Sequence, residues 1–126
     1  MLKPGLAIVV KPNLSRVVVW VGGRPVADTR RALTVRIGTG SAADYVPFED
    51  VQMSLLKRRQ FDARQMGAGH KVYFDILFGS TRIECAAWTF DEQLEGTDVV
   101  REYVAFDASK VDAIEQQPRH GMVQPW

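Results

Sequence analysis

The chain has 126 residues, a length that suits one domain with a single hydrophobic core. Apolar residues make up 46% and charged residues 25%, as in ordinary soluble globular proteins, and the formal net charge of +1 argues against a strong field that would attract nucleic acid or an anionic membrane. The single cysteine, Cys85, excludes an internal disulfide and a thiolate zinc site and suits the reducing cytoplasm, while the apolar run at residues 6–10 is too short for a signal-peptide core or a membrane span.

The first strands are predicted around the Gly22-Gly23 pair. β-Branched residues precede the two glycines in SRVVVWVGGRPVAD (residues 15–28), which favours a hairpin with a two-residue loop. Such a loop would place Val21 opposite Arg24, Trp20 opposite Pro25 and Val19 opposite Val26. Residues 30–37, RRALTVRI, alternate apolar and polar side chains and predict the next strand.

One short helix is predicted near residues 48–57. In VPFEDVQMSLLK, Pro47 suits a first helical turn, acidic residues follow it, and basic residues come at the other end, as the helix dipole favours. Phe48, Val51 and Leu55 would then form one apolar stripe that lies on a sheet.

A second hairpin is predicted in HKVYFDILFGSTRIECAAW (residues 70–88), with its turn at Gly79-Ser80. The facing pairs are then Phe78 with Thr81, Leu77 with Arg82, Ile76 with Ile83, Asp75 with Glu84, Phe74 with Cys85 and Tyr73 with Ala86. Cys85 is expected to be a small core residue. Asp75 and Glu84 are either an exposed pair in which Arg82 neutralises Asp75, which we favour, or a carboxylate pair that shares a proton or a cation.

The final strands are predicted as a third hairpin. VVREYVAF (residues 99–106) and KVDAIE (residues 110–115) flank a loop at residues 107–109. The fold class is therefore mainly β, with two antiparallel sheets built from hairpins. Residues 1–115 would form a single β-rich domain and residues 116–126 a loosely ordered tail.

The glycines before the second hairpin raise the question of a phosphate-binding loop. In MGAGHKVYF, Val72 stands where a P-loop needs a serine or threonine, and the following pattern is that of a strand. A strand that begins at about Lys71 cannot gather successive amides around one phosphate. The segment is therefore interpreted as a strand lead-in.

Four short motifs resemble the domain-of-unknown-function family DUF427, to which a nucleotidyltransferase label is attached. They are VADTRRAL, YVPFEDVQMSLL, AAW and YVAFDASKVDA, in the order of the family, and the resemblance extends over residues 8–115. It implies a compact domain similar to the β-tent folds, in which two antiparallel sheets lean together and whose members bind zinc, small rings or protein partners. It implies no established activity. The family's Cys-Pro-aromatic-Lys-Gly motif falls on residues 65–69, where only Gly69 matches, so no role of that thiol or lysine carries over.

Two groups of residues are candidates for a ligand site. Tyr45, Tyr73 and Trp88, together with Trp20, could line an aromatic pocket between the sheets, although aromatic residues at strand spacing are more often core. Asp28 and Arg31 could fix the polar ends of a ligand, or they could only brace the corner in which they lie.

Two function classes follow. The first, which we prefer, is a binding module for a small molecule or a protein. The second is an enzyme of the nucleotidyltransferase type, which needs carboxylates that converge on magnesium. No catalytic residue, metal site or cofactor is predicted, and neither nucleic acid nor a membrane is an expected partner. A homodimer formed by pairing edge strands is a third, weaker interpretation.

Overall fold

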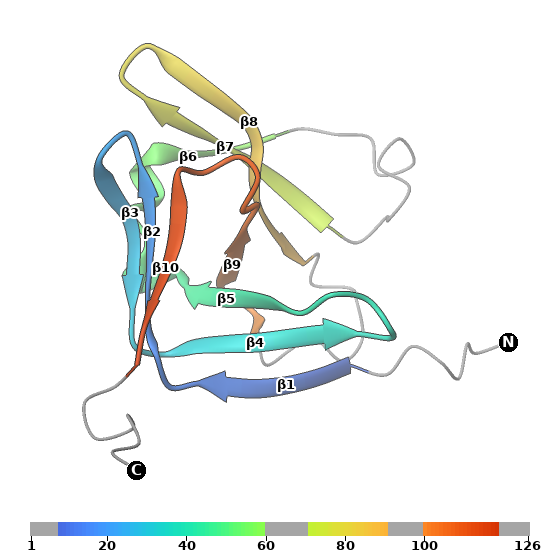
Figure 1. Cartoon of the computed structure of the whole chain (residues 1–126). Coiled ribbons are helices and arrows are strands. Elements are labelled where there is room, and N and C mark those ends of the chain that lie inside the picture. The colour runs from blue at the N-terminus through green and yellow to red at the C-terminus, as the bar shows by residue number, and fades with distance from the viewer. Residues whose placement is uncertain (1–7, 60–70, 91–99, 119–126) are drawn as a thin grey trace, which may run out of the picture.

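The structure is a computed structural model that describes residues 8–59, 71–90 and 100–118. These residues form ten strands and two short 3-10 turns (Figure 1). The strands are β1 (Ile8–Asn13), β2 (Arg16–Val21), β3 (Arg24–Thr29), β4 (Ala32–Ile37), β5 (Ala43–Pro47), β6 (Leu56–Arg58), β7 (Lys71–Phe78), β8 (Thr81–Phe90), β9 (Tyr103–Phe106) and β10 (Ala113–Gln117). The 3-10 turns are η1 (Phe48–Asp50) and η2 (Met53–Leu55).

The strands form two antiparallel sheets. The larger sheet has seven strands in the order β1-β4-β5-β9-β8-β7-β6, and the smaller has three in the order β10-β2-β3. Figure 1 shows the smaller sheet along one side of the larger one, with β1 and β4 below and the β7–β8 hairpin above. The predicted fold class, mainly β with two antiparallel sheets, is confirmed.

The main hydrophobic core joins the two sheets. Buried side chains from both sheets pack together in it, among them Val19, Val21, Val26, Val46, Phe74, Ile76, Val104 and Phe106. Successive side chains of a strand point to opposite faces of the sheet, and these residues are the ones that point inward. The alternation of apolar residues along each strand therefore places them together.

A second apolar cluster comes from the opposite pleat of the large sheet. Pairing in register sets Leu33, Tyr45, Ala105, Trp88 and Tyr73 side by side across five strands. Tyr45 and Ala105 in this row are buried, and Trp88 packs against them. The aromatic residues at strand spacing therefore occupy one continuous face.

The helix predicted near residues 48–57 is wrong. The chain forms η1 and η2 there, and Val51 between them is extended and bridges to Ala27 of β3. The Gln52 amide donates to the carbonyl of Val26 at 2.8 Å. Pairing with the edge of β3 thus satisfies backbone groups that a helix would have bonded internally, and tertiary context overrides a weak local preference.

The first hairpin is confirmed next to its turn and differs further along. Val21 faces Arg24 and Trp20 faces Pro25, as predicted, but Val19 faces Ala27 because a bulge intervenes. Val26 is the extra residue, and its carbonyl is the one that accepts from Gln52. The bulge is therefore coupled to the segment that lies along the edge of β3.

The third predicted hairpin is wrong. β9 pairs with β5 and β8 in the large sheet, whereas β10 pairs with β2 in the small sheet. The turn at residues 107–110 therefore carries the chain from one sheet to the other. β10 continues to Gln117, past the predicted start of the tail, and most of that tail lies outside the described residues.

No helix in the described parts of the chain has the length and apolar character to cross a lipid bilayer.

The tips of two hairpins meet at Gly22 and Phe78. Gly22 and Gly23 both have positive φ, and a Cβ at Gly22 would lie 2.0 Å from Cζ of Phe78, whereas one at Gly23 would meet nothing within 4 Å. We expect Gly23→Ala to lower the free energy of unfolding by about 1 kcal/mol through backbone strain alone.

Gly22→Ala adds the displacement of the Phe78 ring and should cost about 2 kcal/mol in total. Urea unfolding of the two variants measures the difference. Equal losses would show that the Phe78 ring moves aside freely.

Candidate functional site

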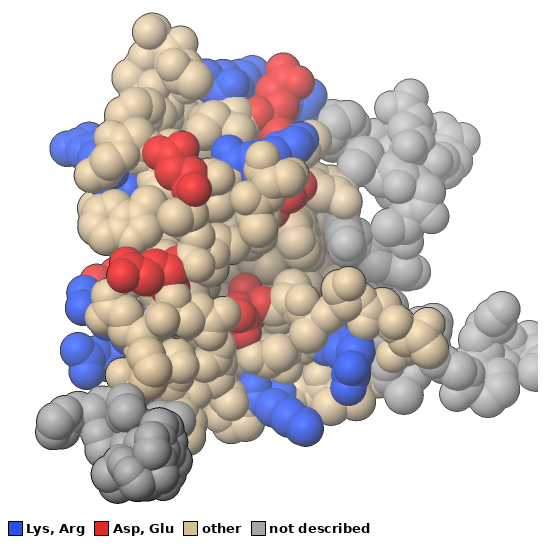
Figure 2. Space-filling view, in the orientation of Figure 1, with Lys and Arg blue, Asp and Glu red and all other residues tan. Residues whose placement is uncertain are grey.

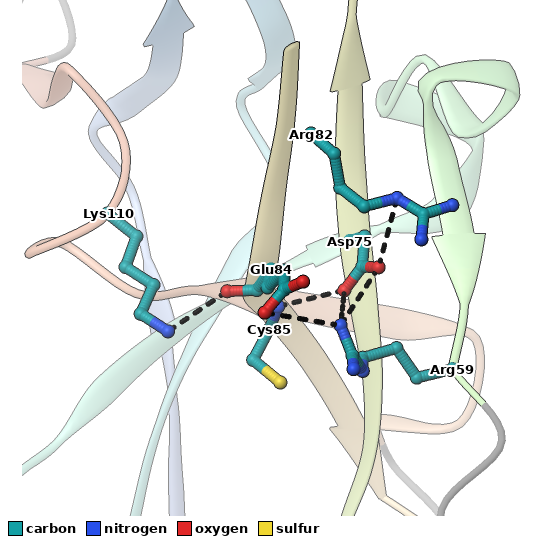
Figure 3. Close-up of polar contacts among 6 residues, drawn as sticks. All are labelled: Arg59, Asp75, Arg82, Glu84, Cys85 and Lys110. Atoms are coloured by element: carbon teal, nitrogen blue, oxygen red, sulfur yellow. Dashed lines mark hydrogen bonds and ion pairs between the residues drawn. The ribbon is translucent and has the colours of Figure 1, made fainter.

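A buried carboxylate, Asp75, lies at the middle of β7. Only 2% of the residue is exposed. Nη1 of Arg59 bonds to both carboxylate oxygens, at 2.9 and 3.0 Å, and Nε of Arg82 lies 3.5 Å from Oδ2 (Figure 3). The amide of Cys85 donates to Oδ1 at 2.9 Å. Charge-assisted hydrogen bonds thus compensate the burial of this carboxylate.

The strand opposite Asp75 is bulged to make this contact. Phe74 faces Ala87 and Ile76 faces Ile83, so residues 84–86 of β8 all lie opposite Asp75. Cys85 has a φ of +54°, a conformation uncommon outside glycine, which turns its amide toward the carboxylate while its thiol points away (Figure 3). From the other side, Nζ of Lys110 donates to the carbonyl of Glu84 at 2.9 Å.

The pKa of Asp75 reflects two opposed effects. Burial alone would raise it, but the hydrogen bonds from Arg59 and from the Cys85 amide, with the charges of Arg59 and Arg82, bring the pKa below its ordinary value of 3.8. Asp75 is therefore ionised at neutral pH.

The predictions for this hairpin are correct only near its turn. Phe78, Leu77 and Ile76 have their predicted partners, but Phe74 does not face Cys85 and Tyr73 faces Trp88 instead of Ala86. The structure also contradicts the exposed Asp75–Glu84 pair, because Asp75 is buried and only Glu84 is exposed. Cys85, expected in the core, is half-buried.

Arg59 is the residue that sequence reasoning missed. The sequence predicts the basic run at residues 57–59 to be the C-terminal end of a helix. It instead forms and follows β6, in which Lys57 pairs with Asp75 and Arg58 with Phe74. The sequence offers one signal for this contact. An aspartate within an otherwise apolar strand needs a basic partner, and residues 57–59 are a basic run.

The three aromatic candidates are brought together on one face of the large sheet. Nε1 of Trp88 donates to the hydroxyl of Tyr45 at 2.8 Å, and the two rings meet edge to face. Tyr45 also stacks on Phe90 with ring centroids 5.5 Å apart. Tyr73 faces Trp88 across the β7–β8 ladder. Burial raises the pKa of Tyr45 to about 12, so this phenol stays neutral.

Asp28 and Arg31 lie in a different place. Asp28 forms a bidentate ion pair with Arg16, and Arg31 pairs with Glu49 and Asp50. Both candidates line a wide-open depression of about 440 Å³ at the corner after β3. They do not line the pocket that contains Trp88.

That pocket lies where β5 and β9 separate. Tyr45↔Ala105 is the last pair of their ladder, and beyond it the strands diverge. The space has a volume of about 350 Å³, and Val46, Phe106 and the inward valines of β2 line it together with Trp88. Most of the residues that line it have apolar side chains, but polar and apolar atoms share its exposed wall.

Two carboxylates stand on opposite sides of this opening. Asp44 lies at the start of β5, and Asp107 directly follows β9. The amide Nδ2 of Asn13 and the hydroxyl of Thr34 donate to Oδ1 of Asp44, and Nε2 of Gln116 donates to Oδ2 at 3.0 Å. This cluster joins the large sheet to β10 of the small sheet.

Asp107 receives hydrogen bonds within its own turn. The hydroxyl and the amide of Ser109 both donate to Oδ1, at 2.7 and 2.9 Å. These bonds lower the pKa of Asp107, so the group is ionised at neutral pH. Figure 2 shows acidic atoms in a hollow near the middle of this face, with basic side chains above and below it.

The described residues contain no group of three or more histidine, cysteine, aspartate or glutamate side chains that could hold a metal ion together. The chemistry that the described site offers is binding through an apolar wall, neutral hydrogen-bonding groups and two negative charges.

A family model described as a domain of unknown function, DUF427, matches residues 9–117, which is most of the chain and nearly the span of the resemblance found in the sequence motifs. The label of this family is of the nucleotidyltransferase type. A search of the curated proteins finds no match.

Proposed function

The chain belongs to the DUF427 family, whose description names no reaction, and we propose that it is a binding module that takes a small molecule into the pocket between β5 and β9. The observation that carries the proposal is the divergence of these strands after Tyr45↔Ala105, which opens a space beside the core that is lined mostly by apolar residues. Its volume of about 350 Å³ falls in the range of small-molecule sites.

The other depressions support the proposal by contrast. The depression at Asp28 and Arg31 is wide open, and its charged side chains already pair with one another. A second one, of about 420 Å³, is lined by residues 47–49 and 101–103 together with Arg31, and Arg31 pairs with Glu49 there. Charged residues form most of the lining of both depressions, whereas most of the residues that line the β5–β9 pocket are apolar.

The alternative is a nucleotidyltransferase, as the family label suggests. Such an enzyme needs carboxylates that converge on magnesium and a cradle for a triphosphate. No lysine or arginine is among the described residues that line the pocket, so the lining offers no basic side chain to hold a triphosphate. We therefore prefer the binding module.

The test is to block the pocket. Ala42 lies at its rim and is exposed, so Ala42→Trp should place an indole over the opening without disturbing the core. The neighbouring Ser41 is also exposed but does not line the pocket, and Ser41→Trp is the matched control.

A fragment library of small aromatic and aliphatic molecules is screened by thermal shift. Ligands that raise the melting temperature of the wild type and of Ser41→Trp should have no effect on Ala42→Trp. Ligands that stabilise all three proteins equally, or a screen without any ligand, would contradict the proposal.

A further inference from the structure

The charge of the β5–β9 pocket is unbalanced. Asp44 of β5 and Asp107, in the turn after β9, both line it, and no lysine or arginine is among the described residues that do so. Two negative charges beside one partly apolar space favour a cation there, because such a space screens charges less well than bulk water does.

Three other carboxylates of this protein have a positively charged partner. Asp28, Asp50 and Asp75 each have an arginine nitrogen within 4 Å. Within the described part of the chain, Asp44 and Asp107 have only neutral donors: the side chains of Asn13, Thr34 and Gln116 for Asp44, and Ser109 for Asp107.

Lys110 lies near Asp107 but does not form an ion pair with it. Its charge favours the ionised form of Asp107, but its ammonium donates to the carbonyl of Glu84. Both hydrogen bonds that Asp107 accepts from the described residues end on Oδ1, so within this part of the chain Oδ2 has room for a further donor.

We infer that the pocket binds organic cations, namely a primary ammonium or a guanidinium on a small apolar body. The cationic head would bond to Oδ2 of Asp107 and lie in the field of Asp44, and the body would pack on Val46, Phe106 and Trp88. A free amine and a lysine side chain on a peptide share this chemistry. The inference rests on the proposed function, since it names the ligand class of the same pocket.

The experiment compares three probes of nearly equal size by isothermal titration calorimetry. Phenethylamine carries the ammonium, 2-phenylethanol replaces it with a neutral hydroxyl, and 3-phenylpropanoate carries a negative charge. The wild type should bind phenethylamine at least about tenfold more tightly than 2-phenylethanol, and 3-phenylpropanoate should not bind. A short peptide with a blocked N-terminus and one unmodified lysine distinguishes the free amine from the lysine side chain. It binds only if the pocket admits an ammonium whose side chain is attached to a backbone.

Two variants locate the effect. Asp107→Asn keeps an acceptor for Ser109 but removes the charge, and it should weaken phenethylamine binding about tenfold while leaving 2-phenylethanol unchanged. Glu115→Gln changes the net charge equally on the exposed surface of β10, outside the pocket, and keeps an acceptor for Trp20. It should leave both affinities unchanged.

The outcomes separate the two proposals. Equal binding of phenethylamine and 2-phenylethanol, blocked by Ala42→Trp, would overturn the cation inference and leave the pocket intact. Equal losses in Asp107→Asn and Glu115→Gln would show a general charge effect and also overturn it. Failure of all probes, together with failure of the fragment screen, would remove the proposed function itself.

Discussion

Replacing Asp75 with alanine is expected to lower the free energy of unfolding by about 3 kcal/mol. The substitution removes the carboxylate that bonds to Arg59 and leaves the bulge amide of Cys85 without its acceptor, at a residue that is only 2% exposed. Breaking a buried ion pair by removing one partner costs about 3–5 kcal/mol, and the lower end applies because the side chain of Arg59 is 25% exposed. Urea unfolding measures the loss.

Glu84→Ala is the matched control for Asp75→Ala. Glu84 lies on the facing strand, its side chain is 66% exposed, and its carboxylate is 3.9 Å from the same guanidinium. It should change stability by less than about 0.5 kcal/mol. Similar losses in the two variants would contradict the assignment of Asp75 as the anchor of the bulge.

Acid provides a second measurement on the same pair. Because folding lowers the pKa of Asp75 below 3.8, its ionic contribution is fully present above that pH and is lost as the pH falls through the folded-state pKa. The difference in stability between the wild type and Asp75→Ala should therefore shrink below about pH 4. A difference that stays constant down to pH 2 would show that the ionised form contributes nothing.

Replacing Trp88 with alanine should also cost about 3 kcal/mol. The indole packs on the buried cluster around Tyr45, so its removal leaves a cavity. It also removes the N–H that donates to the Tyr45 hydroxyl. Truncating a large core aromatic costs about 3–5 kcal/mol, and the half-buried Trp88 belongs at the lower end. Trp88→Phe keeps the ring contact but loses the N–H donor, so it should lower the free energy of unfolding by about 1 kcal/mol.

Trp20→Ala is the control for Trp88→Ala. Trp20 is also half-buried, but it belongs to neither core cluster, and its N–H bonds to the exposed Glu115. It should destabilise the protein much less than Trp88→Ala. If the two substitutions cost the same, Trp88 is not part of a structural cluster, and its place would be only in the pocket.

Pairing next to tight turns could be predicted from the sequence. The Gly22-Gly23 and Gly79-Ser80 loops fix the first facing residues on each side, because a two-residue loop allows one local register. Both hairpins depart from that register at a bulge. The bulges depend on partners distant in the chain, Gln52 for one and Arg59 with Asp75 for the other. No local pattern contains that information.

The errors elsewhere have the same physical origin. Residues 48–57 have the spacing of an amphipathic helix, but backbone pairing with β3 outweighs that preference. Residues 99–115 alternate like a hairpin, yet the two strands join different sheets. Propensity describes each strand but not its partner.

The candidate site was only partly accessible to sequence reasoning. Four aromatic residues, Tyr45, Tyr73, Trp88 and Trp20, were predicted as candidates for one pocket. Tyr45, Tyr73 and Trp88 share a face of the large sheet, but only Trp88 lines the β5–β9 pocket, and Trp20 lies in the small sheet. Asp44 carried no signal, since its three hydrogen-bond partners come from β1, β4 and β10. Asp107 had a weak one, because aspartate two residues before a serine is typical of a turn held by its own side chain.

The pairing of β10 with β2 has a consequence for how the chain folds. Its partners, from Ala113 with Trp20 to Gln117 with Arg16, come from opposite ends of the described chain. During synthesis the β2–β3 hairpin therefore emerges early. It is only marginally stable, and the edge of β2 has no partner until β10 is synthesised. Closing so long a loop predicts slow folding, on the order of milliseconds to seconds, and makes the nascent β2 edge the place where two unfinished chains would pair.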